Sequence, residues 1–185
     1  MGLMRVRVIS GSMRGKKLVS PPDERVRPTL DRVKENIFNM IAFNVPGALV
    51  LDLFSGSGAL GIEALSRGAD SVVFVDKSEE SLFVTKENLR LTSFSDKAEC
   101  VNKSFDDYLK ICDKKFDLIF LDPPYADGLL DEAISLIYEK KLLKDGGLII
   151  CESDDSPAFV PDEKLFSVSR IKKYGRVQIV LLTNI

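Results

Sequence analysis

Short apolar runs alternate with amphipathic stretches from residue 48 onward. The apolar runs have the length of strands and cover residues 48–54, 71–76, 98–102, 116–122 and 147–152. The stretches between them have helical spacing and cover residues 58–67, 79–92, 104–112 and 128–142. Strands that alternate with helices form a parallel sheet covered on both faces, joined by right-handed crossovers. The pattern therefore predicts an α/β fold with a doubly wound, mostly parallel sheet.

Both ends of the chain depart from this alternation. Residues 167–182 form two strand-like runs around Gly175, which predicts a hairpin and a sheet that ends with an antiparallel strand. Near the N-terminus, residues 4–10 and 16–19 could pair as a small β-hairpin. Residues 27–41 carry apolar side chains on one helical face and predict an amphipathic helix.

We expect one domain over residues 1–185, in which residues 1–45 form a basic extension and residues 46–185 form the core. Residues 1–34 contain nine Lys/Arg and three acids, a net charge of +6, whereas the remainder carries −8. A basic segment on an acidic body indicates an anionic partner at one end of the molecule.

The composition excludes several classes of enzyme. The chain has no histidine, so Ser-His-Asp and Cys-His catalysis are excluded and a catalytic zinc site is not expected. Its three cysteines are an odd number without metal-type spacing, and we expect buried, reduced thiols. Neither a signal-peptide block nor a membrane-spanning apolar run is present. These features predict a cytoplasmic protein that binds no metal and no membrane.

A glycine-rich loop follows the first predicted strand of the core. Residues 56–61 (Gly-Ser-Gly-Ala-Leu-Gly) fit the G-x-G-x-x-G pattern, and Asp76 ends the next strand. Gly56 permits a tight turn and Gly58 a close backbone approach to a ligand, while Asp76 can accept hydrogen bonds from two ribose hydroxyls. Asp52, beside the loop, would repel a pyrophosphate but could help to bind a methionine ammonium. We therefore favour S-adenosylmethionine, and a dinucleotide oxidoreductase remains an alternative.

The strand at 116–122 ends in an unusual turn at residues 122–125 (Asp-Pro-Pro-Tyr). Proline lacks an N–H group for the sheet, so the turn stands at the carboxyl end of the strand, where α/β sheets bind ligands. The Asp122 carboxylate and the Pro123 carbonyl could accept the two N–H bonds of a nucleobase amine and make its lone pair reactive. Tyr125 could stack on the base. This chemistry requires neither histidine nor metal.

The turn matches the (Asp/Asn/Ser)-Pro-Pro-(Tyr/Phe) motif of amino-methyltransferases, and nearly the whole chain resembles the RsmD family. That family methylates the exocyclic N2 of a guanine in bacterial small-subunit ribosomal RNA. The resemblance rests on residues 9–18 (ISGSMRGKKL), 27–41 (RPTLDRVKENIFNMI), 51–69 (LDLFSGSGALGIEALSRGA) and 173–177 (KYGRV). Ser10, Ser55 and Lys34 depart from the residues expected of the family, and we expect none of them to touch the chemistry.

The resemblance implies a Rossmann-like methyltransferase sheet, S-adenosylmethionine as cofactor, and three groups of site residues. The catalytic group is Asp122, Pro123, Pro124 and Tyr125. The cofactor group is Asp52, Phe54, Gly56, Ser57, Gly58, Asp76, Ser104, Phe105 and Asp122, although Phe105 could equally be a core residue. The residues expected to contact RNA are Arg5, Arg7, Arg14, Lys16, Lys17, Arg27, Thr29, Asp31 and Arg32.

The expected partner is ribosomal RNA or the assembled small subunit, with the enzyme acting as a monomer. Gly11 and Gly15 would let the hairpin backbone approach the RNA. Three other functions remain open: adenine N6 methylation, glutamine methylation, and RNA binding without catalysis. A chain of 185 residues leaves no room for the separate target-recognition domain of a DNA enzyme, and the basic segment disfavours a protein substrate.

Overall fold

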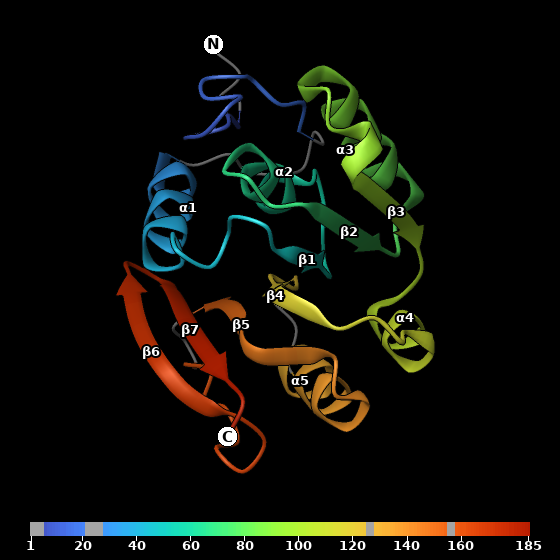
Figure 1. Cartoon of the computed structure of the whole chain (residues 1–185). Coiled ribbons are helices and arrows are strands. Elements are labelled where there is room, and N and C mark those ends of the chain that lie inside the picture. The colour runs from blue at the N-terminus through green and yellow to red at the C-terminus, as the bar shows by residue number, and fades with distance from the viewer. Residues whose placement is uncertain (1–5, 21–27, 125–127, 155–157) are drawn as a thin grey trace.

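The computed structural model describes residues 6–20, 28–124, 128–154 and 158–185, except the side chains of residues 28–30. The helices are α1 (Pro28–Met40), α2 (Ala59–Ser66), α3 (Glu79–Thr92), α4 (Phe105–Ile111) and α5 (Leu129–Lys140), with a 3-10 turn η1 (Ser95–Lys97). The strands are β1 (Leu49–Asp52), β2 (Ser71–Asp76), β3 (Ala98–Asn102), β4 (Phe116–Leu121), β5 (Leu143–Asp154), β6 (Ser167–Tyr174) and β7 (Val177–Thr183). Figure 1 shows the helices distributed over both faces of the sheet.

The seven strands form one sheet in the order β3-β2-β1-β4-β5-β7-β6. The pairings from β3 through β5 are parallel, whereas β7 runs antiparallel to both β5 and β6. The predicted doubly wound sheet and its antiparallel end are confirmed. The strand order reverses between β1 and β4, and the carboxyl ends of strands at such a reversal are where α/β sheets bind ligands.

Alternate residues of each strand face two separate hydrophobic cores. Val50, Phe74 and Phe120 belong to the core that α1, α2 and α3 cover. Their neighbours Leu51 and Ile119 belong to the core that α4 and α5 cover. Because successive side chains of a strand point to opposite faces, this alternation defines which strand residues face which helices.

Most predicted boundaries agree with the observed elements within one or two residues. Ser78 accepts a hydrogen bond from Ser81 N at 3.2 Å and caps α3 as its sequence position predicts. The strand expected at 48–54 ends earlier, at Asp52, because the chain turns there into the glycine loop. β5 begins earlier than residue 147, because Gly146, with φ of 76°, forms a bulge that continues the strand.

The N-terminal hairpin is smaller than predicted. Its two arms are joined by a single antiparallel bridge between Arg7 and Lys17, and Val8 N donates to Lys16 O at 2.9 Å. Leu18 N also donates to Val6 O at 2.8 Å, and the hairpin backbone bonds in addition to α2, as described below. Residues 4–5 of the expected first arm lie outside the described residues.

Two expectations about cysteines and membranes can be compared with the structure. Cys151 is buried as expected, but Cys100 and Cys112 are only half-buried; all are free thiols. Among the described residues, every helix is too short or too polar to span a bilayer.

Candidate active site

A cavity of about 610 Å³ lies at the carboxyl ends of β1, β2, β4 and β5. Volumes of roughly 300–1,000 Å³ are typical of small-molecule sites. Val6, Asp31 and Lys34 form one wall, so the N-terminal segment and α1 close the cavity on one side. The segment predicted to bind RNA therefore borders the site predicted to bind the cofactor.

The strand register brings four carboxyl groups to this cavity on one face of the sheet. Asp52 pairs with Phe74 of β2 and Phe120 of β4. Asp76 and Asp122 follow two residues after these phenylalanines, and therefore lie one level beyond Asp52 on the same face. Leu121 pairs with Cys151, so Glu152 is the neighbour of Asp122 on the next strand.

Asp76 holds the glycine loop as well as facing the cavity. Its Oδ2 atom accepts a hydrogen bond from Gly56 N at 2.9 Å, and Oδ1 accepts one from Ser78 N at 2.8 Å. An ionised carboxylate has about four acceptor sites, so about two remain for incoming hydroxyl groups. This leaves the capacity that the predicted ribose contact requires.

Asp52 is almost completely buried beneath the loop, where its Oδ2 atom accepts a hydrogen bond from Gly61 N at 3.0 Å. The pKa of Asp52 is raised to about 7, chiefly by burial; the hydrogen bond from Gly61 opposes this shift, and the nearby carboxylates of Asp122 and Asp76 add to it. A cation bound next to Asp52 would favour its ionised form.

Different structural constraints explain the glycines of the loop. Gly56 lines the cavity, as does Ser57. A Cβ atom on Gly58, whose φ is 77°, would lie 2.8 Å from Thr85 Cγ2, and one on Gly61 would lie 2.3 Å from a ring carbon of Phe74. The absence of a side chain at Gly58 is therefore explained by packing against α3 and β2, and Gly58 does not line the cavity.

Aromatic rings form another part of the cavity wall. Phe54 and Phe105 both line it, with ring centroids 5.2 Å apart. Phe105 also packs against the core that α4 and α5 cover, and its contact with adenine stays a prediction. Ser104 lines the cavity and caps α4 by accepting a hydrogen bond from Asp107 N at 3.3 Å. Hydrogen bonds from Lys110 and Ser104 lower the pKa of Asp106 to about 2, as suits an acid at a helix start.

The proline turn enters the same cavity. Asp122, Pro123 and Pro124 all line it; Pro123 is buried, whereas Asp122 and Pro124 are exposed. Tyr125 lies outside the described residues, as do Arg5 and Arg27, and the side chain of Thr29 is not described either.

Sequence analysis missed one carboxyl group of the cavity. Glu152 of β5 lines the cavity, is 8% exposed, and has its pKa raised well above the usual range by burial and by the Asp122 carboxylate. An acid at the end of the predicted strand 147–152 was the available signal. Lys34 and Ser55, which depart from the residues expected of the family, also line the cavity.

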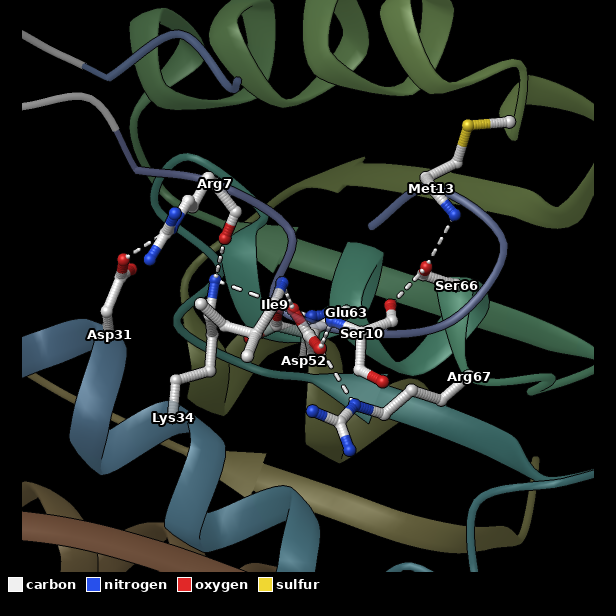
Figure 2. A network of polar contacts seen from close by, with 11 residues as sticks. Arg7, Ile9, Ser10, Met13, Asp31, Lys34, Asp52, Glu63, Ser66 and Arg67 are labelled. Carbon is white, nitrogen blue, oxygen red and sulfur yellow. Dashed lines mark hydrogen bonds and ion pairs between the residues drawn. The ribbon is translucent and has the colours of Figure 1, made fainter. Parts of the chain in front are cut away.

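Glu63 of α2 fastens the N-terminal segment to the core (Figure 2). Its fully buried carboxylate accepts hydrogen bonds from Ile9 N at 2.8 Å, Ser10 N at 3.0 Å and Arg67 Nε at 2.7 Å. Lys34 Nζ lies 3.6 Å from the same carboxylate. Burial lowers the pKa of Lys34, although Glu63 opposes this effect. The charges around Glu63 hold the hairpin, α1 and α2 together.

The described basic residues differ in their surroundings. Arg14, Lys16, Lys17 and Arg32 are exposed. Arg7 forms an ion pair with Asp31 at 3.1 Å, which joins the hairpin to α1.

The two hairpin glycines also differ. A Cβ atom on Gly11 would lie 1.8 Å from Ser66 O, so packing against α2 by itself requires a glycine at this position. Gly15 has no such neighbour and stays a candidate for close approach.

The lining residues fit a cationic nucleoside cofactor better than a pyrophosphate. Five carboxyl groups and two lysine ammonium groups line the cavity, which favours a bound cation. The buried Ser55 Oγ atom has no hydrogen-bond partner among the described residues, and so could bind a ligand. In the part of the chain that the structure describes, no group of three or more acidic or cysteine side chains is arranged to hold a metal ion.

Comparison with known proteins agrees with this geometry. The family described as "Conserved hypothetical protein 95" matches residues 6–183. Ribosomal RNA small subunit methyltransferase D from Haemophilus influenzae is 42% identical over 183 residues, covering 97% of this chain and 94% of that protein. The solved structure of yhhF from Escherichia coli has a TM-score of 0.89 and 32% identity, covering 98% of each chain.

A more distant solved structure shares the fold. It is the 16S rRNA N2 G1207 methyltransferase RsmC from Thermus thermophilus, in complex with AdoMet and guanosine. Its TM-score is 0.69 at 24% identity, over 89% of this chain and 45% of that chain. From the match over residues 6–183 and the close full-length relatives, the chain belongs to the family of ribosomal RNA small subunit methyltransferase D.

Proposed function

We propose that this chain transfers a methyl group from S-adenosylmethionine to the exocyclic N2 amine of a guanine in small-subunit ribosomal RNA. One observation carries the proposal: the glycine loop with Asp76 and the turn of Asp122, Pro123 and Pro124 line the same cavity. A ribose-binding carboxylate thus lies in one cavity with a turn rich in acceptors. The name of the relative from Haemophilus influenzae supports ribosomal RNA as the substrate.

The cofactor half of the site uses carboxylates and aromatic rings. Asp76 offers its remaining acceptor sites to the two ribose hydroxyls, and Phe54 and Phe105 offer apolar surface to the adenine. Asp52, in its ionised form, attracts the positively charged methionine end. S-adenosylmethionine, when bound, supplies a methyl group carried on a positively charged sulfur.

The substrate half prepares the amine. The lone pair of a nucleobase amine is delocalised into the ring, so the amine is a weak nucleophile. Asp122 and the Pro123 carbonyl accept hydrogen bonds from the two N–H groups of the amine and favour its pyramidal, reactive form. Because proline fixes φ, the carbonyl is held in place before the substrate arrives. After methylation the nitrogen carries an extra proton, which passes to Asp122 or to water. Tyr125 stacks on the base and holds it in place.

The extension at residues 1–45 binds RNA in this proposal, and residues 46–185 form the catalytic core of the same domain. The target base must leave its stack to reach the cavity, as base-modifying enzymes generally require. The exposed Arg14, Lys16 and Lys17 lie on the hairpin that borders the cavity, where phosphate contacts would position the RNA without reading its sequence. The monomer is the working form.

Mass mapping of ribosomal RNA tests the proposal. RNA from cells that lack this protein should lose one methyl group, on the N2 atom of one guanine. The wild-type chain should restore the methyl group and Asp122→Ala should not, while Asp96→Ala, a change at an exposed acid outside the cavity, should restore it. A methyl group lost from an adenine would contradict the guanine assignment, and an unchanged methylation pattern would contradict the activity.

A further inference from the structure

Glu152 is a buried acid of the cavity that the proposed chemistry leaves without a role. It is 8% exposed and lines the cavity, and no donor among the described residues hydrogen-bonds to its carboxyl group. Because Glu152 lines the cavity, a bound ligand can supply a hydrogen-bond partner for its carboxyl group. The missing partner is therefore expected to arrive with a ligand.

The strand order places Glu152 on the substrate side of the cavity. β1 and β2 end with Asp52 and Asp76 of the cofactor half, and Asp122 directly follows β4. β5 lies on the other side of β4 from β1, as Figure 1 shows. Glu152 consequently lies beyond Asp122 from the cofactor residues, where a base whose amine meets Asp122 would present its remaining edge.

The carboxyl groups of Asp122 and Glu152 are neighbours that differ in exposure. Asp122 is exposed, whereas Glu152 is buried, and both burial and the Asp122 carboxylate raise the pKa of Glu152. Both effects favour the protonated form of Glu152. A neutral carboxylic acid offers one O–H donor and one C=O acceptor side by side.

We propose that Glu152 is a specificity residue that pairs with the N1–H and O6 groups of the target guanine while Asp122 meets its N2 amine. This inference rests on the proposed function. The carbonyl oxygen of the protonated Glu152 carboxyl group accepts a hydrogen bond from N1–H, and the O–H of the same group donates one to O6. Adenine lacks both complementary groups at these positions, since its N1 is an acceptor and it carries an amine in place of O6. Reading a flipped base through its Watson–Crick edge is usual in base-modifying enzymes.

Two substitutions of similar volume separate hydrogen bonding from packing. Glu152→Gln keeps a donor and an acceptor side by side, and Glu152→Leu removes both. With small ribosomal subunits from cells lacking the protein, single-turnover methyl transfer should fall less than about tenfold in the Gln variant. It should fall by roughly a hundredfold in the Leu variant, as expected for a bidentate base contact. Affinity for S-adenosylmethionine, measured by calorimetry, should stay within about twofold in both.

A base analogue tests specificity directly. RNA that carries 2-aminopurine at the mapped target keeps the 2-amine, but its N1 is an acceptor and it lacks O6. The wild-type chain should methylate guanine at least about tenfold faster than 2-aminopurine, and the Leu variant should lose most of this preference. Glu139→Gln, a change at an exposed residue of α5 outside the cavity, serves as the matched control and should behave as wild type.

Each result supports or overturns the inference. A Leu variant with wild-type rate and wild-type base preference would overturn it, and so would a Gln variant as slow as the Leu variant. Should the Leu variant fail to fold, pH–rate profiles decide: the wild-type rate should fall at alkaline pH as Glu152 ionises, whereas the Gln rate should not. Identical profiles would overturn the pairing. Failure of the wild-type chain to methylate any guanine would instead overturn the proposed function.

Discussion

Replacing Glu63 with Gln should loosen the N-terminal hairpin and lower the free energy of unfolding by about 3–5 kcal/mol. The Glu63 carboxylate is fully buried and accepts from two hairpin amides and from Arg67, with Lys34 at 3.6 Å. The Gln amide can accept only through its single oxygen, so at least one buried N–H group loses its partner, at a cost of about 1–3 kcal/mol. Arg67 and Lys34 also lose their counter-charge. Lys34 limits this second cost because burial already lowers its pKa, so it can release its proton.

Urea denaturation measures the total loss, and amide hydrogen exchange locates it. The amides of Ile9 and Ser10 should exchange faster in the variant, while amides of the central strands should change only in line with global stability. Glu87→Gln is the matched control, because Glu87 pairs with Arg90 on the exposed face of α3, and its loss should leave stability nearly unchanged. A Glu63→Gln loss below about 1 kcal/mol, or hairpin amides as protected as in the wild type, would refute the reasoning.

The remaining predictions concern chemistry, RNA and pH. Asp122→Ala should slow single-turnover methyl transfer by roughly a hundredfold or more without unfolding the chain; a loss below about tenfold would indicate a merely structural turn. Neutralising Arg14, Lys16 and Lys17 together should reduce the slope of log K for RNA binding against log salt concentration by roughly two units, if all three contact phosphates of single-stranded RNA. An unchanged slope would mean that the RNA binds elsewhere. Because burial raises the pKa of Asp52 to about 7, the folded chain holds a proton that the unfolded chain releases near pH 4, so this group's stabilisation is lost as pH rises from about 4 to 7. Affinity for S-adenosylmethionine should show the opposite trend and rise between pH 6 and 8, by roughly tenfold if only ionised Asp52 binds, and Asp52→Asn should remove most of that rise in calorimetry.

The sequence predicted the sheet because its signals were local. Alternating apolar runs identify strands, and an acid or proline at the end of a run marks where the strand meets the ligand. Asp52, Asp76 and Asp122 were recognised in this way, and all three line one cavity. Glu152 has the same signal at the end of its strand, but its exposure and its missing partner become visible only when β5 lies beside β4.

Long-range packing could not be predicted from local patterns. The reason for Gly11 is a contact with Ser66, more than fifty residues away in the sequence, and the reason for Gly58 is a contact with Thr85. Similarly, only the folded chain brings Ile9 and Ser10 to the Glu63 carboxylate. A residue whose partner is distant in sequence carries no sign of that partner in its own segment.

The helix α2 connects the glycine loop to the N-terminal hairpin. Its N-terminal end follows the glycine loop, and its last turn carries Glu63 and Ser66, which hold the hairpin. Each helical residue adds about 1.5 Å along the axis and about 100° around it. Inserting one residue between Gly61 and Glu63 would therefore turn the Glu63 carboxylate away from the hairpin amides while leaving the glycine loop in place. The spacing between the glycine loop and the N-terminal hairpin is thus set by the number of residues in α2. Evolutionary insertions should be accommodated in surface loops such as 112–115 and excluded from this helix.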